Sequence, residues 1–234
     1  MIRLTRISLL FTLSITIVLS GCRKDWDAGT EAPLDYLVKD GVLVTQNPYG
    51  RTPQSAIARF KTFEPCKVIV SINGQQPIEY EVSNYVENHE TPIVGLYHNA
   101  VNEITLTITD QEGVFAYKHI ELTIGHVDDK LPEIEVNTAA SNVEPGLIFC
   151  DMHLANYGTF ATNIIAVDNF GKIRYHLDLE EYGEITWPLQ RFKNGNLFLA
   201  NQFGIYEFNM LGKELNHWNL AGYRAHHDLV EMPN

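Results

Sequence analysis

The stretch RAHHDLVEMPN at the end of the sequence brings together side chains that could do chemistry. His226 and His227 are adjacent, and Asp228 follows them directly. An imidazole can act as a nucleophile or exchange a proton near neutral pH, and a carboxylate can orient its ring. The alternation after Asp228 is typical of a β-strand, in which neighbouring side chains point to opposite faces. Only one histidine of the pair can therefore face a given site, and strand geometry leaves open which one.

A structural interpretation of these residues also stays open. A histidine at the start of a strand can instead complete a hydrogen bond between neighbouring sheets. Asp228 can orient an imidazole or satisfy a nearby backbone N–H. The elements that position these residues decide between the interpretations.

The N-terminus predicts export and a lipid anchor. An apolar run from Ile7 to Val18 is too short for a permanent membrane span and is typical of a signal peptide over residues 1–21. The sequence LSGC resembles a lipobox, so we expect cleavage before Cys22 and acylation of this residue. Residues 22–33 are polar and predict a tether. Because Arg23 stands where inner-membrane lipoproteins commonly carry aspartate, we expect an outer-membrane lipoprotein that faces the periplasm or the cell surface.

Acidic side chains outnumber basic ones by 29 to 17, which gives a formal net charge of -12. Removal of Arg3 and Arg6 with the signal peptide makes this charge about -14. No basic patch offsets phosphate repulsion, so nucleic acid is not an expected partner. Apolar residues make up 45% of the chain, enough for a globular protein with real cores.

Cysteines are few. Besides Cys22 there are only Cys66 and Cys150, each in an apolar strand-like run. Export permits disulfides, but we expect two buried single thiols rather than a bridge because the two runs fall in different predicted domains. The spacing of cysteines and histidines matches no metal motif, so the sequence predicts neither a metal site nor a cofactor.

Residues 34–126 predict an antiparallel β-sandwich of immunoglobulin type. Short runs with a period of two residues alternate with Asn, Gly, Pro and Asp turns, which predicts about seven strands. Ile104, Leu106 and Ile108 share one face of such a strand, so one face is dry and the other wet. The runs are GVLVTQ, AIARFKT, KVIVSIN, IEYEV, PIVGLY, NEITLTITD and YKHIELTI.

Residues 137–234 contain an internal repeat. IAVDNFGKIRYHLDL over 165–179 aligns with YEFNMLGKELNHWNL over 206–220, so that Gly171 falls on Gly212. A period of about 40 residues made of strands and tight turns is typical of a four-stranded propeller blade. The sequence therefore predicts an all-β fold, in which the sandwich is followed by the first two to three blades of an incomplete propeller. An open arc of two blades leaves an apolar flank exposed, so we expect this part to be marginal alone.

Several stretches together resemble the bacterial aryl-sulfate sulfotransferases. They are NPYGRTPQSAIARFKT, PIVGLYHNAVNEITLTITD, VDNFGKIRYH and HHDLVEMPN. The resemblance implies an exported enzyme with a six-bladed propeller. It implies transfer of a sulfuryl group from a phenolic sulfate ester to a phenol acceptor through a sulfated histidine, without a nucleotide sulfate donor. It also implies that His227 lines the funnel beside the sulfate, whereas the nucleophile and a sulfate-binding arginine belong to later blades.

Other residues are secondary candidates. Tyr97 and Phe160 could wall an aromatic substrate pocket, although such residues in a β-protein are more often core. His176 and His217 occupy equivalent repeat positions, which indicates a structural role. The remaining histidines of the sandwich and linker are expected to be solvated; they are His89, His98, His119 and His126.

We therefore expect an aryl-sulfate sulfotransferase whose 234-residue chain is an incomplete N-terminal portion, inactive by itself. Its partners would be a phenolic sulfate donor, a phenol acceptor, the membrane through the lipid anchor, and a second copy in a homo-oligomer. The alternative is a non-catalytic surface lipoprotein that binds a glycan or a protein through the sandwich and the propeller.

Overall fold

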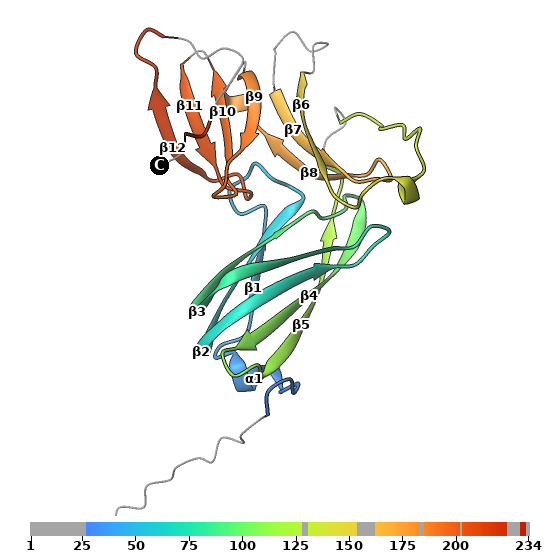
Figure 1. Ribbon diagram of the computed structural model, residues 1–234, viewed down its shortest axis with the longest axis vertical. Coiled ribbons are helices and arrows are strands. Elements are labelled where there is room, and N and C mark those ends of the chain that lie inside the picture. Colours follow the sequence, from blue (N-terminus) through green and yellow to red (C-terminus); the bar gives the residue numbers. More distant parts are fainter. Residues whose placement is uncertain are drawn as a thin grey trace, which may run out of the picture.

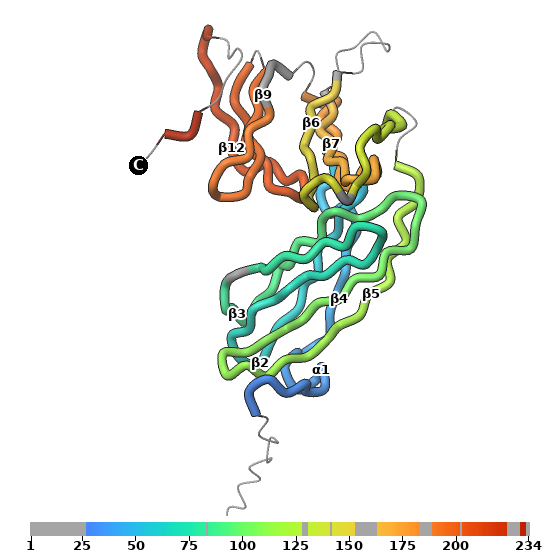
Figure 2. Tube along the Cα trace, turned by 45° about the vertical axis from the view of Figure 1, so that its right-hand side comes forward, coloured from blue at the N-terminus to red at the C-terminus, as the bar shows by residue number. Residues whose placement is uncertain are grey.

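The computed structural model describes residues 27–127, 131–153, 162–182, 185–201, 203–223 and 230–232. These residues are almost entirely β, as the sequence predicts. Two groups of sheets are present, with the second group at one end of the first (Figure 1 and Figure 2). Among the described residues, no helix has the length and apolarity needed to cross a membrane.

Residues 27–127 form one curled antiparallel sheet with a short helix at its end. The strand order is β1-β2-β4-β5, and β3 pairs with the other side of β2. The elements are α1 (Leu34–Leu37), β1 (Leu43–Gln46), β2 (Ser55–Ile72), β3 (Ile78–Val94), β4 (Ala100–Asp110) and β5 (Phe115–Ile124).

The prediction of seven strands is wrong, because β2 and β3 each run through two predicted strands. The pairing of β2 with β3 shifts register between Lys61 and Cys66, next to Pro65, which has no N–H to donate to a ladder. The first part of β2 pairs with β1, and the last part pairs with β4. The sheet thus curls around one core (Figure 1).

The alternation in β4 is confirmed. Ile104, Leu106 and Ile108 are buried in this core, whereas Thr105 and Thr107 on the other face are partly exposed. One histidine departs from expectation: His89 is only 5% exposed, stacks on Phe60 and lies 3.2 Å from the Thr62 hydroxyl. His119 and His126 are exposed and His98 is partly buried.

The second part of the chain forms two antiparallel sheets, here called blade 1 and blade 2. Blade 1 has the order β6-β7-β8, and blade 2 has the order β12-β11-β10-β9. The blade 1 strands are β6 (Ile148–His153), β7 (Thr162–Val167) and β8 (Ile173–Asp178). The blade 2 strands are β9 (Ile185–Arg191), β10 (Leu197–Asn201), β11 (Gly204–Phe208) and β12 (Glu214–Asn219). Two single-turn 3-10 helices precede β6 and β9, at Ala140–Asn142 and Glu180–Tyr182.

The two blades pack face to face, and the innermost strands β6 and β9 approach each other. Ala166, Tyr175 and Leu177 of blade 1 contact a core shared with Tyr206 and Phe208 of blade 2. Residues at equivalent repeat positions lie on the same side of their blades. Ala166 is on the side of blade 1 that faces blade 2. Its equivalent Glu207 is on the corresponding side of blade 2, which points away from blade 1.

The cysteine prediction is half right. Cys66 and Cys150 are both free, and Cys66 is buried in the sandwich core. Cys150 is exposed, contrary to expectation, because it lies on the face of blade 1 that points away from blade 2. That face holds an open apolar pocket of about 400 Å³ lined mainly by β6, β7 and the segment from Ile134 to Val143.

Candidate functional site

Most of the predicted site residues lie outside the described part of the chain. These are His226, His227, Phe160 and the lipidation residue Cys22. Their roles stay predictions. Tyr97 is the one predicted site residue that the structure describes.

The described residues on either side of the histidine pair lie at opposite ends of blade 2. The N–H of Tyr223 donates to Leu220, and the N–H of Leu220 donates to Phe203, next to the turn between β10 and β11. Glu231 Oε2 instead accepts from the N–H of Lys193, in the hairpin between β9 and β10.

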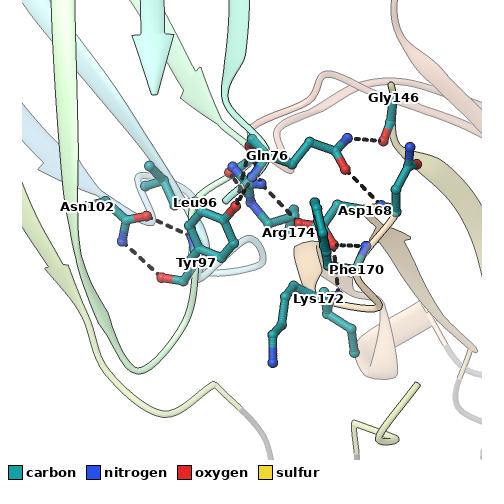
Figure 3. Close-up of polar contacts among 12 residues, drawn as sticks. Gln76, Leu96, Tyr97, Asn102, Gly146, Asp168, Phe170, Lys172 and Arg174 are labelled. Atoms are coloured by element: carbon teal, nitrogen blue, oxygen red, sulfur yellow. Dashed lines mark hydrogen bonds and ion pairs between the residues drawn. The ribbon is translucent and has the colours of Figure 1, made fainter. Parts of the chain in front are cut away.

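Tyr97 lies where the sandwich meets blade 1 (Figure 3). Its ring centroid is 3.5 Å from the guanidinium carbon of Arg174, and its hydroxyl accepts from the N–H of Gln76 at 3.1 Å. Asn102 bonds the backbone N–H and carbonyl of Tyr97 and so fixes the loop that carries the ring. This cation–π contact accounts for the position of Tyr97 without a substrate.

Arg174 is the centre of this contact, and its side chain is fully buried. It donates from Nε to the carbonyl of Gly95 at 2.8 Å and from Nη1 to the carbonyl of Gln76 at 2.9 Å. Nη1 also lies 3.2 Å from Asp168 Oδ2, so the buried cation has a buried counter-ion. Because its charge is paired with Asp168 and its Nε and Nη1 donate inside the protein, this fully buried arginine is a structural group rather than a sulfate ligand.

Asp168 belongs to the hairpin between β7 and β8. Its Oδ1 accepts from the N–H groups of Phe170 and Lys172, both at 2.9 Å. Gly171 completes the turn with φ of 75°, a conformation that glycine adopts without strain. The carboxylate therefore shapes the turn with one oxygen and pairs with Arg174 through the other.

A second polar region lies where residues 49–51 of the sandwich approach the end of blade 1. It encloses about 370 Å³ and is lined by Tyr49, Arg51 and three carboxylates, Asp178, Glu180 and Glu181. Arg51 forms an ion pair with Glu181 and packs over the ring of Tyr182. Because carboxylates outnumber the cation, this region does not suit a sulfate ester.

The two modules of this architecture each match a family model. Residues 43–125 match the arylsulfotransferase Ig-like domain, and residues 133–234 match the arylsulfotransferase (ASST) domain. The chain belongs to the arylsulfotransferase family. No curated protein matches it.

The two arylsulfotransferase domains meet at a polar interface, here called the interdomain interface. On the Ig-like side it consists of residues 51–54, Gln76 and residues 95–97. On the other side it consists of Gly146, residues 168–178 and residues 211–212. The sequence did not single out Gln76, Asp168 or Arg174, because a lone polar residue at a turn or in a strand carries no signal of a distant partner.

Other groups of the arylsulfotransferase blades also have structural explanations. His176 lies 2.8 Å from Asn163 Oδ1, and His217 stacks on Tyr206 with centroids 4.3 Å apart. Burial disfavours the charged form of Glu207, but hydrogen bonds from Asn216, Asn196 and Asn194 outweigh this and lower its pKa. Within the described ranges, no three His, Cys, Asp or Glu side chains gather in a way that could hold a metal ion.

Proposed function

We propose that this arylsulfotransferase moves a sulfuryl group from a phenolic sulfate ester to a phenol acceptor. The observation that supports this most is the pair of family domains, which occur in order along the chain and pack on each other through the interdomain interface. No nucleotide donor enters the proposed reaction, since the ester itself supplies the activated sulfate.

The proposed reaction has two steps through a sulfohistidine. In the first, an imidazole nitrogen forms a bond to sulfur while the bond from sulfur to the phenolic oxygen breaks, and an acid protonates the departing oxygen. In the second, a base removes the proton of the acceptor phenol, whose oxygen takes the sulfuryl group as the nitrogen–sulfur bond breaks. We propose His227 as this acid and base, with His226 on the opposite face of the strand.

We further propose that residues 1–234 alone do not catalyse transfer. The described strands build two blades, and a propeller ring needs at least four to close. An unclosed funnel admits water, which competes with the phenol for the sulfuryl group. One funnel histidine also cannot serve as nucleophile, sulfate ligand and acid together.

The test is turnover of 4-nitrophenyl sulfate with a phenol acceptor. It compares the 234-residue chain, a version with a completed propeller, and the His226→Ala and His227→Ala variants of that version. We expect the completed version alone to be active and His227→Ala to lose about 10²- to 10⁴-fold in rate, with a small effect of His226→Ala. A larger loss from His226→Ala would assign the site to the other face of the strand.

The competing outcome of this test is a protein without chemistry. An inactive completed version that nevertheless binds a glycan or a protein would indicate a surface binding lipoprotein. Activity of the 234-residue chain itself would contradict the need for further blades.

We also propose that Cys22 carries lipid and anchors the protein in the outer membrane. The apolar run that ends at LSGC and the polar tether after it support this. Mass spectrometry of the membrane fraction should find a chain that begins at acylated Cys22, and Cys22→Ala should release the protein. An unmodified chain that begins elsewhere would contradict the anchor.

A further inference from the structure

The strand β8 forms the outer edge of blade 1, as β12 does in blade 2, and a segment of the Ig-like domain lies along this edge. The carbonyl of Arg51 accepts from the N–H of Asp178 at 2.9 Å. At the other end of β8, Gln54 Nε2 donates to the carbonyl of Ile173 at 2.7 Å. Residues 51–54 therefore satisfy the N–H of Asp178 and the carbonyl of Ile173 on the free edge of β8.

The same segment also reaches blade 2. Thr52 Oγ1 donates to the carbonyl of Leu211 at 2.8 Å, and Arg51 Nη1 donates to the carbonyl of Gly212 at 3.1 Å. Thr52 is fully buried, so its hydroxyl contacts the blade instead of water. Arg51, Thr52 and Gln54 thus connect the Ig-like domain to both blades.

Gln76, at the tip of the hairpin between β2 and β3, makes a further contact with blade 1 (Figure 3). Its Nε2 donates to the carbonyl of Gly146 at 2.6 Å, and its Oε1 accepts from the N–H of Asn169 at 2.8 Å. Both bonds of this side chain therefore cross the interdomain interface. The buried cation Arg174 also donates to the carbonyls of Gly95 and Gln76. Blade 1 therefore depends on hydrogen-bonding groups that only the Ig-like domain provides.

We propose that the Ig-like domain is a structural part of the propeller itself. Residues 51–54 cover the free edge of β8, the outermost strand of blade 1, and both blades hold their structure only when they are docked on this domain. The proposal concerns folding and does not depend on sulfuryl transfer. It predicts that substitutions in the Ig-like domain at the interface destabilise the blades more than the domain that carries them.

The chain offers separate probes for its two parts. Trp187 and Trp218 both lie in blade 2, whereas residues 34–126 contain no tryptophan. In a Trp26→Phe background, tryptophan fluorescence therefore reports on the blades during urea unfolding. Hydrogen exchange read by mass spectrometry resolves peptides of β4 and β5 from peptides of β7, β8 and β11.

The decisive comparison is Gln76→Ala with Gln75→Ala, because the two glutamines are neighbours and Gln75 is exposed. We expect Gln76→Ala to speed exchange in the blade peptides about tenfold or more, since two hydrogen bonds across the interdomain interface are lost. The urea concentration at the midpoint of its fluorescence transition should fall, while hydrogen exchange in β4 and β5 stays unchanged. Gln75→Ala should behave as the parent protein.

Arg174→Met provides a second test from the blade side. We expect a loss of the fluorescence transition, or a fall of its midpoint by about 1 M urea or more, with the Ig-like domain still protected. Arg191→Met is the matched control, because Arg191 is exposed and its Nε donates to Gly195 within blade 2. Equal blade stability in Gln76→Ala and Gln75→Ala, or unchanged blades in Arg174→Met, would overturn the proposal.

Discussion

The hairpins between β7 and β8 and between β11 and β12 are copies of one sequence repeat with different neighbours. In each hairpin, the N–H of the first turn residue, Asp168 or Asn209, donates to the carbonyl of the fifth, Lys172 or Lys213, at 3.0 Å. The glycine at the fourth position has positive φ in both. Asn209 Oδ1 accepts from Leu211 and Lys213 at 3.0 Å, as Asp168 Oδ1 accepts from Phe170 and Lys172.

The two hairpins differ in charge. Asp168 pairs with buried Arg174, whereas the equivalent positions of blade 2 hold Asn209 and the exposed Leu215. The difference matches the groups that the Ig-like domain presents to each hairpin. To blade 1 it presents the carbonyls of Gly95 and Gln76, which accept from Arg174. To blade 2 it presents the donors Arg51 and Thr52, which bond carbonyls of the blade. The repeat thus determines the turn, and the neighbouring domain determines which copy needs a charge.

The largest effect should come from removing the first side chain of each hairpin. Asp168→Ala loses two turn hydrogen bonds and leaves Arg174 buried without a counter-ion, which costs about 3–5 kcal/mol of unfolding free energy. Asn209→Ala loses only turn bonds and should cost about 1–2 kcal/mol. Urea unfolding followed by tryptophan fluorescence measures both. Equal losses would mean that the charge does not distinguish the hairpins.

Asp168→Asn and Asn209→Asp isolate the contribution of the negative charge to stability. Asp168→Asn keeps an acceptor for the turn but removes the anion, so we expect most of the loss seen in Asp168→Ala, about 3 kcal/mol. Asn209→Asp adds an anion at a position without a buried cation and should change the free energy of unfolding by less than about 0.5 kcal/mol. A neutral Asp168→Asn variant would show that the pair with Arg174 contributes nothing.

Alanine substitutions at the turn glycines Gly171 and Gly212 should differ in their effect on stability by a smaller amount. Both have positive φ, so alanine costs about 1–2 kcal/mol at either position. A Cβ at Gly171 would also meet the carbonyl oxygen of Ile134 at 2.7 Å, whereas at Gly212 the nearest atom is Arg51 Cβ at 3.0 Å. Gly171→Ala should therefore lower the thermal midpoint more than Gly212→Ala, and the reverse order would contradict these contacts.

The smallest effect concerns Glu207, whose equivalent in blade 1 is Ala166. Because the amide hydrogen bonds lower its pKa in the folded protein, its contribution to stability is present above the ordinary carboxyl pKa of about 4.3. That contribution is lost as pH falls through the lowered folded pKa. Unfolding measured from pH 6 to pH 3 should be less pH-dependent in Glu207→Gln than in the parent. Identical pH profiles would remove this role.

The sequence predicts local features of this molecule well. Period-two alternation places Ile104, Leu106 and Ile108 in the core, and the repeat that pairs Gly171 with Gly212 identifies two equivalent hairpins. These features depend on a few neighbouring residues. The number of strands is wrong because β2 and β3 each continue through a predicted break, and β2 passes Pro65 with a shifted register.

Features that depend on distant partners were not predictable. Nothing near His89 in the sequence shows that Phe60 covers its ring, and nothing near Arg174 shows the carbonyls of Gly95 and Gln76. Cys150 is in an apolar run, but its exposure depends on which faces of blade 1 are covered. For the proposed site, only Tyr97 lies among the described residues, and its cation–π partner is 77 positions away in the chain.

The Ig-like domain meets Arg174 through backbone carbonyls, and this has a consequence for how arylsulfotransferases of this kind can diverge. A carbonyl is present whatever side chain a residue carries, so the bonds that Arg174 donates to Gly95 and Gln76 depend on the path of the chain and not on a particular side chain. What must persist is the path of the chain, including the positive φ of Gly95. Related sequences should therefore preserve an arginine on one side of this contact and a loop shape on the other.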